Sequence, residues 1–183
     1  MTAAVAERPR RTGHRLAVVA VVGVVMVLVV MWVYAFFFAD TSSPDRLHDR
    51  AWAVQAQATC QPFADQIAAL PPARQFADIQ PKSAALLQRA PVVDHVTELL
   101  AQMVAQLRRS TPADANGRQL VAAWLGDYDS YLDARRVQTA KWHVGDDPRF
   151  AVAEVDGQPI DSRMDDFADA NAMVSCKTPG DLA

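Results

Sequence analysis

The sequence lacks the short motifs by which many enzymes are identified. Its 183 residues contain no G-x-S-x-G or S-x-x-K serine motif, no H-E-x-x-H zinc motif and no calcium loop of the Asp-x-Asp-x-Asp-Gly kind. Internal repeats and low-complexity linkers are also missing. The sequence therefore assigns no catalytic residue, cofactor or metal site, and a non-enzymatic role is expected over an enzymatic one.

Basic residues are scarce outside the N-terminus, which excludes one class of partner. Four of the 18 Lys and Arg residues, but only one of the 21 Asp and Glu residues, precede Asp40. The remainder carries 14 basic and 20 acidic residues, a net charge of −6 with histidine neutral. Nucleic-acid binding depends on clustered Lys and Arg that neutralise phosphates. We therefore expect no nucleic-acid partner.

Charge is absent altogether from Leu16 to Ala39. A helix of this length spans roughly 36 Å, more than the hydrocarbon core of a bilayer at about 30 Å. Trp32, Tyr34 and three phenylalanines crowd its C-terminal end, as aromatic rings do at a membrane interface. We predict a transmembrane anchor in contact with the lipid bilayer. The lack of an ionisable group within it argues against a channel or transporter.

The flanking charges predict the orientation of this anchor. Four arginines and a lone Glu7 precede it, whereas Asp40 follows it and the next basic residue is Arg46. The positive-inside rule places the N-terminus in the cytoplasm. The expected parts are a basic cytoplasmic tail (1–15), a signal anchor in the plasma membrane (16–39) and an extracytoplasmic domain (40–183).

A cleaved secretory signal peptide is the alternative to an anchor. Val33, Tyr34 and Ala35 offer the one passable cleavage site. The apolar stretch is, however, longer than a secretory signal's apolar region and ends in aromatic rather than small residues. These two features favour an uncleaved, single-pass anchor.

The only two cysteines, Cys60 and Cys176, both lie in the part expected outside the cell. Disulfides form and persist in that compartment. A redox-active pair normally has a Cys-x-x-Cys spacing, whereas 115 residues separate these two. We predict a structural Cys60–Cys176 disulfide that ties the first helix of the domain to its C-terminal segment.

Prolines, capping residues and apolar spacing predict a bundle of about four helices in the outer domain. The expected starts are Ser43–Pro44, Pro91, the Thr111–Asp114 capping box and the Ser162–Asp165 capping box. In the first helix the predicted buried stripe is Leu47, Ala51, Val54, Ala58, Phe63, Ile67 and Leu70, with a kink or break at Pro62.

The predicted third helix is long and amphipathic. Its expected buried side is Val121, Trp124, Tyr128, Tyr131 and Leu132, with Arg135 and Arg136 near the exposed side. Gly145 suits the residue after its C-terminus. One small hairpin follows, in which Asp156–Gly157 is the turn. The fold class is thus mainly α, with one hairpin and one N-terminal span.

Three outer histidines and two tryptophans are the remaining candidates for a binding site. His48, His95 and His143 have no spacing that places two of them on one helix face. A metal site would require three distant segments to converge, or His143 to bind with Asp146, Asp147 and another ligand. Trp52 and Trp142 fall off the clearest apolar stripes. We therefore expect one of these two rings to be exposed for contact with a partner.

The chain resembles single-pass membrane proteins of the actinobacterial cell envelope. The resemblance rests on its Ala-, Val- and Arg-rich, Lys-poor composition, its single N-terminal span and its two outer cysteines. It implies a location and carries over no catalytic residue.

Two functional hypotheses follow. The first is a non-enzymatic anchored protein whose outer domain binds another envelope or membrane protein, or stabilises a membrane assembly. The second is an outer-face enzyme, or a metal-, small-ligand- or lipid-binding domain that uses a cleft between helices.

Overall fold

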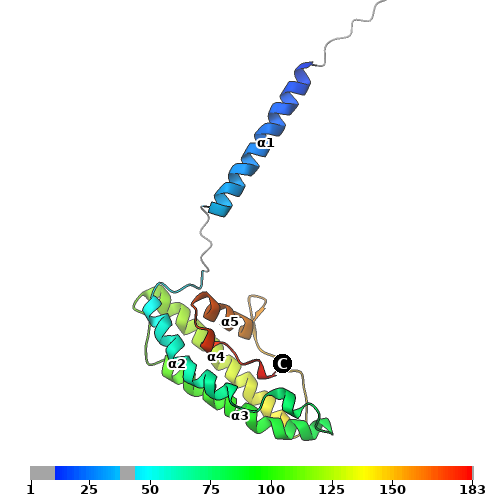
Figure 1. The fold of residues 1–183 in the computed structure, drawn as a ribbon, viewed down its shortest axis with the longest axis vertical. Coiled ribbons are helices and arrows are strands. Elements are labelled where there is room, and N and C mark those ends of the chain that lie inside the picture. The colour runs from blue at the N-terminus through cyan, green and yellow to red at the C-terminus, as the bar shows by residue number, and fades with distance from the viewer. Residues whose placement is uncertain (1–10, 38–43, 183) are drawn as a thin grey trace, which may run out of the picture. The chain divides into compact units, whose positions relative to one another are not determined.

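The computed structural model of the chain describes residues 11–37 and 44–182, in two compact units divided at Ser42 and Ser43. The first unit contains α1 (Arg11–Phe37) and the second the helical domain (Figure 1). The domain contains α2 (Arg50–Ala68), η1 (Ala73–Phe76), α3 (Lys82–Leu107), α4 (Ala115–Trp142), β1 (Glu154–Val155), β2 (Gln158–Pro159), α5 (Ile160–Ala170), η2 (Val174–Cys176) and η3 (Gly180–Leu182). The prediction of a mainly helical fold with one small hairpin is confirmed.

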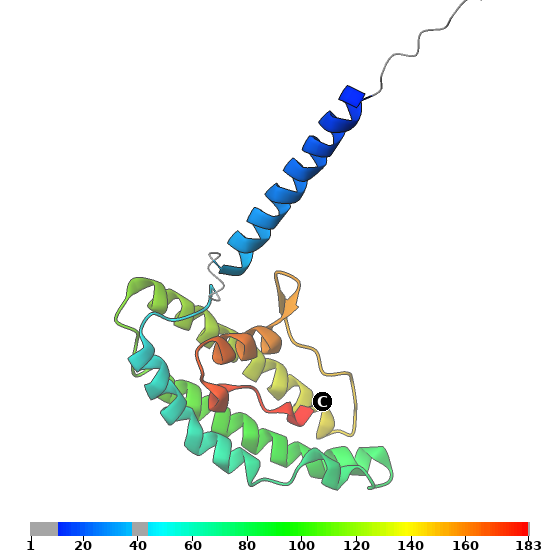
Figure 2. The same ribbon diagram turned by 45° about the horizontal axis from the view of Figure 1, so that its top comes forward.

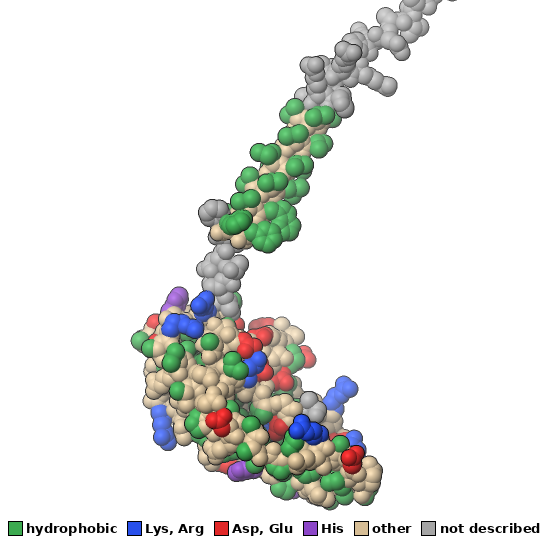
Figure 3. Space-filling model, in the orientation of Figure 1, with side chains coloured by type: hydrophobic (Ala, Val, Ile, Leu, Met, Phe, Trp, Pro, Cys, Tyr) green, Lys and Arg blue, Asp and Glu red, His purple; other side chains and the backbone are tan. Residues whose placement is uncertain are grey.

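Helix α1 is long and apolar enough to cross a membrane. The stretch Ala17–Phe37 has a mean hydropathy of 2.8, and its side chains are exposed. Figure 3 shows hydrophobic side chains along the helix, with Lys, Arg, Asp and Glu on the surface of the helical domain. Trp32, 56% exposed, stacks on Phe36, and Tyr34 is also exposed. Leu16 lies within α1, whereas Ala39 lies outside the described residues.

The helical domain is built around the antiparallel pair α3 and α4. Helix α2 packs against α3, α5 packs against α4, and η2 returns to α2 (Figure 2). The interior between them is formed by leucine, valine, methionine and aromatic side chains, including Leu100, Met103, Trp124, Met164 and Phe167. Burial of this apolar surface is the main stabilising term of the bundle.

Helix α2 begins later than predicted. Its N-cap is Asp49, whose carboxylate accepts from the Trp52 amide at 3.0 Å, so the helix does not start at Pro44, and Ser43 lies outside the described residues. The preceding segment is held by Asn171, whose side chain accepts from the Leu47 amide at 2.8 Å and donates to the Asp45 carbonyl at 2.9 Å. Hydrogen bonds to a distant residue thus replace the first helical turn that the capping signals favoured.

Leu47, the first residue of the predicted stripe, is buried as predicted, but the next three are not. Ala51, Val54 and Ala58 are exposed, while the buried residues are Trp52, Ala53, Ala56, Cys60 and Phe63. The second half is closer, because Ile67 and Leu70 pack against the core. The helix runs through Pro62 without a break.

Helix α3 begins at Lys82, nine residues before the predicted start, and contains Pro91 in its interior. Proline leaves the carbonyl four residues earlier without its helical partner. Pro91 and Leu87 are both exposed, so water can reach that side of the helix. The apolar spacing Val92, Val96, Leu99, Met103 and Leu107, with Val93, Leu100 and Val104 beside it, predicts the buried face of this helix. All of these residues are buried except Val92, which is half-buried.

The two later capping boxes are not used as predicted. Helix α4 has Asp114 as its N-cap, which accepts from the Gly117 amide at 2.7 Å. Helix α5 begins at Ile160, directly after the hairpin. Asp165 therefore does not cap the helix, and its carboxylate accepts a hydrogen bond from the Thr178 amide. The hairpin turn is confirmed, since Asp156 and Gly157 have φ of 54° and 78°, as a type I′ turn requires. Gly145 also has the predicted left-handed conformation, with φ of 77°.

The predicted Cys60–Cys176 disulfide is confirmed, with a Cα–Cα distance of 5.2 Å and both residues fully buried. It joins α2 to η2 across a sequence separation of 116 residues. A cross-link over so long a loop removes conformational entropy from the unfolded chain.

We expect the double substitution Cys60→Ser, Cys176→Ser to lower the free energy of unfolding by about 2–5 kcal/mol. Denaturant unfolding of the full-length protein in detergent, followed by the fluorescence of the buried tryptophans, measures this change. The wild-type protein treated with reductant is the control and should show the same loss. Equal stability of oxidised and reduced protein would contradict the prediction.

Candidate functional site

The centre of the domain contains an arginine that the sequence pattern placed outside. Arg135 on α4 is fully buried, with 0% exposure, so its prediction as a residue near the exposed side is wrong. Arg136 beside it is exposed, as predicted. A buried guanidinium keeps its charge only where hydrogen bonds and an opposite charge replace water.

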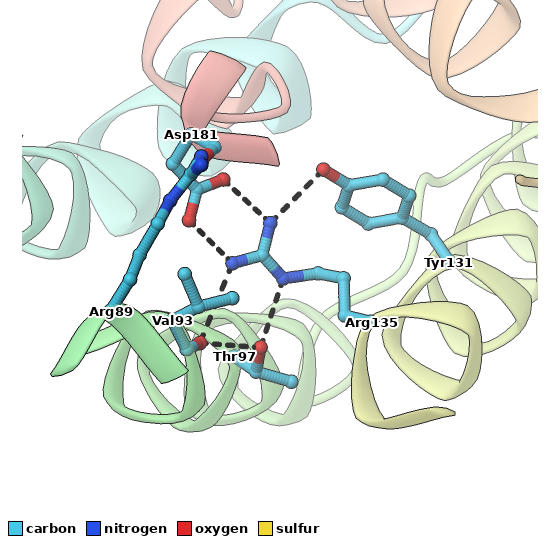
Figure 4. Close-up of polar contacts among 6 residues, drawn as sticks. All are labelled: Arg89, Val93, Thr97, Tyr131, Arg135 and Asp181. Atoms are coloured by element: carbon cyan, nitrogen blue, oxygen red, sulfur yellow. Dashed lines mark hydrogen bonds and ion pairs between the residues drawn. The ribbon is translucent and has the colours of Figure 1, made fainter. Parts of the chain in front are cut away.

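The groups that replace water around the Arg135 guanidinium come from three separate segments of the chain (Figure 4). The Asp181 carboxylate accepts two hydrogen bonds from Arg135, both of 2.7 Å, in the forked geometry that suits a guanidinium. Nε donates to Thr97 Oγ1 on α3 at 2.9 Å, and Nη1 donates to the Tyr131 hydroxyl at 3.2 Å. Asp181 thereby fixes the C-terminal segment to α3 and α4.

The charge state of this cluster follows from its contacts. Burial alone would lower the pKa of Arg135, but the hydrogen bonds and charge of Asp181 outweigh it, and the pKa is raised. Burial raises the pKa of Tyr131, against the opposing effect of Arg135. Neither group can serve as a base at neutral pH. The arrangement is suited to holding a carboxylate rather than to moving a proton.

A second arginine lies on the other side of Asp181. Arg89 on α3 donates from Nη2 to the Asp181 backbone carbonyl, and its guanidinium lies 4.9 Å from the centre of the Trp142 ring. Its Nε is buried and has no hydrogen-bond partner among the described residues. Burial lowers the pKa of Arg89, while the nearby carboxylates of Asp181 and Asp147 raise it.

Arg89 also lines two adjoining cavities. A groove of about 580 Å³ lies between η1 and the first turns of α3. A smaller cavity of about 150 Å³ lies between the end of α2, η1 and α3, and reaches Asp181. Ala73, Phe76 and Arg89 line both spaces, so the two adjoin at these side chains.

The predicted partner contacts Trp52 and Trp142 are both buried, with 3% exposure each. Trp52 belongs to the main core, and Trp142 packs with Leu86, Ala90 and Val93. The expectation of an exposed ring is therefore wrong for both. The prediction from helical spacing failed for two reasons. Helix α2 begins at Arg50, later than expected, and the early turns of α3, which begins at Lys82, cover the end of α4.

The three histidines do not form a site. His48, His95 and His143 are exposed, and His143 bonds Asp94 at 2.6 Å. No group of three or more His, Cys, Asp or Glu residues in the described part of the chain is placed to hold a metal ion.

The buried arginine could have been found from the sequence. Tyr128, Tyr131 and Arg135 follow one another at steps of three and four, so the apolar stripe of α4 continues directly onto Arg135. Its polarity suggested the opposite face. No local pattern points to Asp181, because the pairing is made across 46 residues.

Comparisons with protein-family models, with curated proteins and with solved structures give no match for this chain. Its function is therefore inferred from its own residues and geometry.

We expect Asp181→Asn to lower the free energy of unfolding by about 3 kcal/mol, because it leaves the buried Arg135 charge without a carboxylate. Denaturant unfolding of the full-length protein measures the loss. Asp133→Asn is the matched control, because Asp133 pairs with Arg136 on the surface and should change stability by less than about 0.5 kcal/mol. Equal effects of the two substitutions would contradict a special role for Asp181.

Alkaline pH should also destabilise the domain through Tyr128. Its hydroxyl is fully buried and donates to the Cys176 carbonyl, and burial raises its pKa above the ordinary value. The folded state therefore holds the proton while the unfolded state releases it, so stability falls as pH rises above about 10.

We expect the free energy of unfolding to fall less between about pH 8 and pH 11 in Tyr128→Phe than in the wild type. At neutral pH the same variant should lose about 1 kcal/mol with its hydrogen bond. Tyr34→Phe in α1 is the control and should follow the wild-type pH profile. Identical profiles for all three proteins would refute the assignment.

Proposed function

We propose that the chain is a single-pass plasma-membrane protein with its helical domain on the outer face, and that it acts by binding rather than catalysis. The proposal is carried by α1, in which Ala17–Phe37 is apolar and exposed to the surroundings along its length. Exposure of that much apolar surface to water is unfavourable, whereas a bilayer accommodates it. The basic N-terminal flank supports a cytoplasmic N-terminus.

The disulfide supports the placement of the helical domain. Cys60 and Cys176 are joined and fully buried, and such structural bridges persist in oxidising compartments outside the cytoplasm. A cytoplasmic domain would meet a reducing environment instead. The charge asymmetry around α1 and the disulfide thus favour the same orientation by independent physical arguments.

A binding role is supported by how the central polar groups are used. Arg135 and Asp181 are bonded to each other and to neighbouring groups, and the Tyr131 hydroxyl is occupied by Arg135. Polar groups that are already hydrogen-bonded to one another stabilise the fold of a binding domain rather than take part in a reaction. The domain binds another envelope protein, or a small ligand in the groove beside Arg89. The groove itself is the observation that favours a small ligand.

The proposed orientation predicts opposite behaviour for two reporters. Alkaline phosphatase fused after Ala183 should be active and green fluorescent protein at the same position should be dark, because each functions on only one side of the membrane. Fusions before Met1 should show the reverse. The membrane fraction should retain the protein after an alkaline carbonate wash. A fluorescent C-terminal fusion would contradict the orientation, and release of a shortened soluble protein would establish the cleaved signal peptide instead.

Partner binding is tested by purification of the tagged full-length protein in mild detergent, with mass spectrometry of what accompanies it. A version with Leu16–Ala39 replaced by an unrelated membrane span is the matched control. A stoichiometric protein partner in both preparations would place the contact in the outer domain, and its loss in the control would place the contact in the membrane. Recovery of the chain with a small molecule alone would contradict a protein partner.

A further inference from the structure

The groove beside Arg89 differs in charge from the rest of the domain. Arg74, Lys82 and Arg89 line it, and no carboxylate is among the described residues of its wall. The outer part of the chain as a whole carries more acidic than basic residues. Asp147 partly offsets this charge by pairing with Lys82, but the lining of the groove itself is cationic, and clefts lined by one sign of charge concentrate ions of the opposite sign.

Two of these cations, Arg74 and Arg89, have N–H donors that no described residue uses. Arg74 is exposed at the mouth. Arg89 has its Nε buried without a partner, although its Nη2 is bonded to Asp181. A buried N–H without a partner costs free energy, which an anion or a polar ligand atom in the groove would recover. Lys82 is largely exposed and pairs with Asp147, so its charge is shared between the groove and that residue.

The walls between these charges are apolar. Phe76, Ile79 and Leu86 line the groove, and the adjoining smaller cavity is lined mainly by Ile67, Leu70 and valines of α3. A cavity of about 150 Å³ is large enough for a group of benzene size. The site therefore combines a cationic mouth with an apolar inner compartment, the pattern of small-ligand pockets that place a few polar groups in a largely apolar wall.

We propose that this groove binds a free, single-chain anionic amphiphile, with its carboxylate or phosphate head at Arg74 and Arg89 and its apolar chain toward the cavity below Phe76. The same domain already holds a carboxylate by this chemistry, because the Arg135 guanidinium donates two hydrogen bonds to the Asp181 side chain. This inference deepens the binding role proposed above by naming a ligand class.

Within the helical domain, the groove lies away from the segment that precedes α2. That segment joins the N-terminal end of α2, whereas the groove is lined by η1 and the first turns of α3, which follow the C-terminal end of α2 in the chain (Figures 1 and 2). A helix of 19 residues is roughly 28 Å long. The tethered end and the binding end of the domain are thus separated by the length of α2.

The test is calorimetric titration of the full-length protein, held in phosphatidylcholine nanodiscs, with sodium octanoate, and with empty nanodiscs as the blank. We expect saturable binding of one octanoate per chain, and no saturable binding of octylammonium or acetate at the same concentrations. Octylammonium has the chain with the opposite charge, and acetate has the charge without the chain. Equal binding of octanoate and octylammonium, or no binding of octanoate, would overturn the proposal.

Two charge-reversal variants locate the site. Arg74→Glu at the groove should weaken octanoate binding by about tenfold or more, because it replaces an attractive charge with a repulsive one. Arg109→Glu, an equally exposed arginine at the opposite end of α3, should change binding by less than about twofold because the charge lies far from the ligand. Both variants should keep the wild-type unfolding midpoint. Equal weakening by both would show a net-charge effect and would overturn the assignment to the groove.

Two further readouts separate this inference from the proposed orientation. Octanoate should change the tryptophan fluorescence of the wild type, because the Trp142 ring lies under the Arg89 guanidinium. The same octanoate-induced change in Trp142→Phe as in the wild type would overturn contact at Arg89. Nanodiscs that contain phosphatidylglycerol should leave the octanoate affinity unchanged at physiological salt, whereas competition would identify a bilayer lipid as the occupant. The reporter fusions do not depend on the groove, so either proposal can fail alone.

Discussion

The domain is organised by the need to pair a charge that it buries completely. Arg135 has no contact with solvent, so its guanidinium requires acceptors on every side, and these come from α3, from its own helix and from the C-terminal segment. Each of these elements is therefore fixed relative to the others by one side chain. The cost of an unpaired buried charge, several kcal/mol, exceeds the contribution of any single apolar contact in the core.

The C-terminal segment owes its position to a series of such contacts. The disulfide joins Cys176 to α2, the Tyr128 hydroxyl bonds the carbonyl of the same residue, and Asp165 bonds Thr178 before Asp181 reaches the two arginines. A segment with few apolar side chains would otherwise have little to hold it against the helices. Its path in turn orients Arg89, which forms the wall shared by the groove and the smaller cavity.

This arrangement connects stability to the proposed binding role. The interior polar groups are used to hold one carboxylate of the chain itself, and the same type of side chain faces outward into a groove with apolar walls. A groove with cationic and apolar lining residues is suited to binding a ligand that has both kinds of group. Burial raises the pKa of Tyr131, and the contacts with Asp181 raise the pKa of Arg135, so both groups keep their protons at neutral pH.

Some features could be predicted from the sequence because they depend only on local pattern or on a small number of candidate residues. The apolar stretch, the long helix with its buried Trp124 and Tyr128, the Asp156–Gly157 turn and the single possible cysteine pair were all accessible in this way. The starts of two helices depend on tertiary structure. Asn171 binds the segment before α2, which therefore begins only at Arg50, and α3 begins at Lys82 and continues through Pro91. It also decided the burial of Trp52, Trp142 and Arg135 and the groove beside Arg89. These features arise where residues distant in sequence meet, and local propensities of a few tenths of a kcal/mol per residue are weaker than the hydrogen bonds, charge pairing and apolar burial formed there.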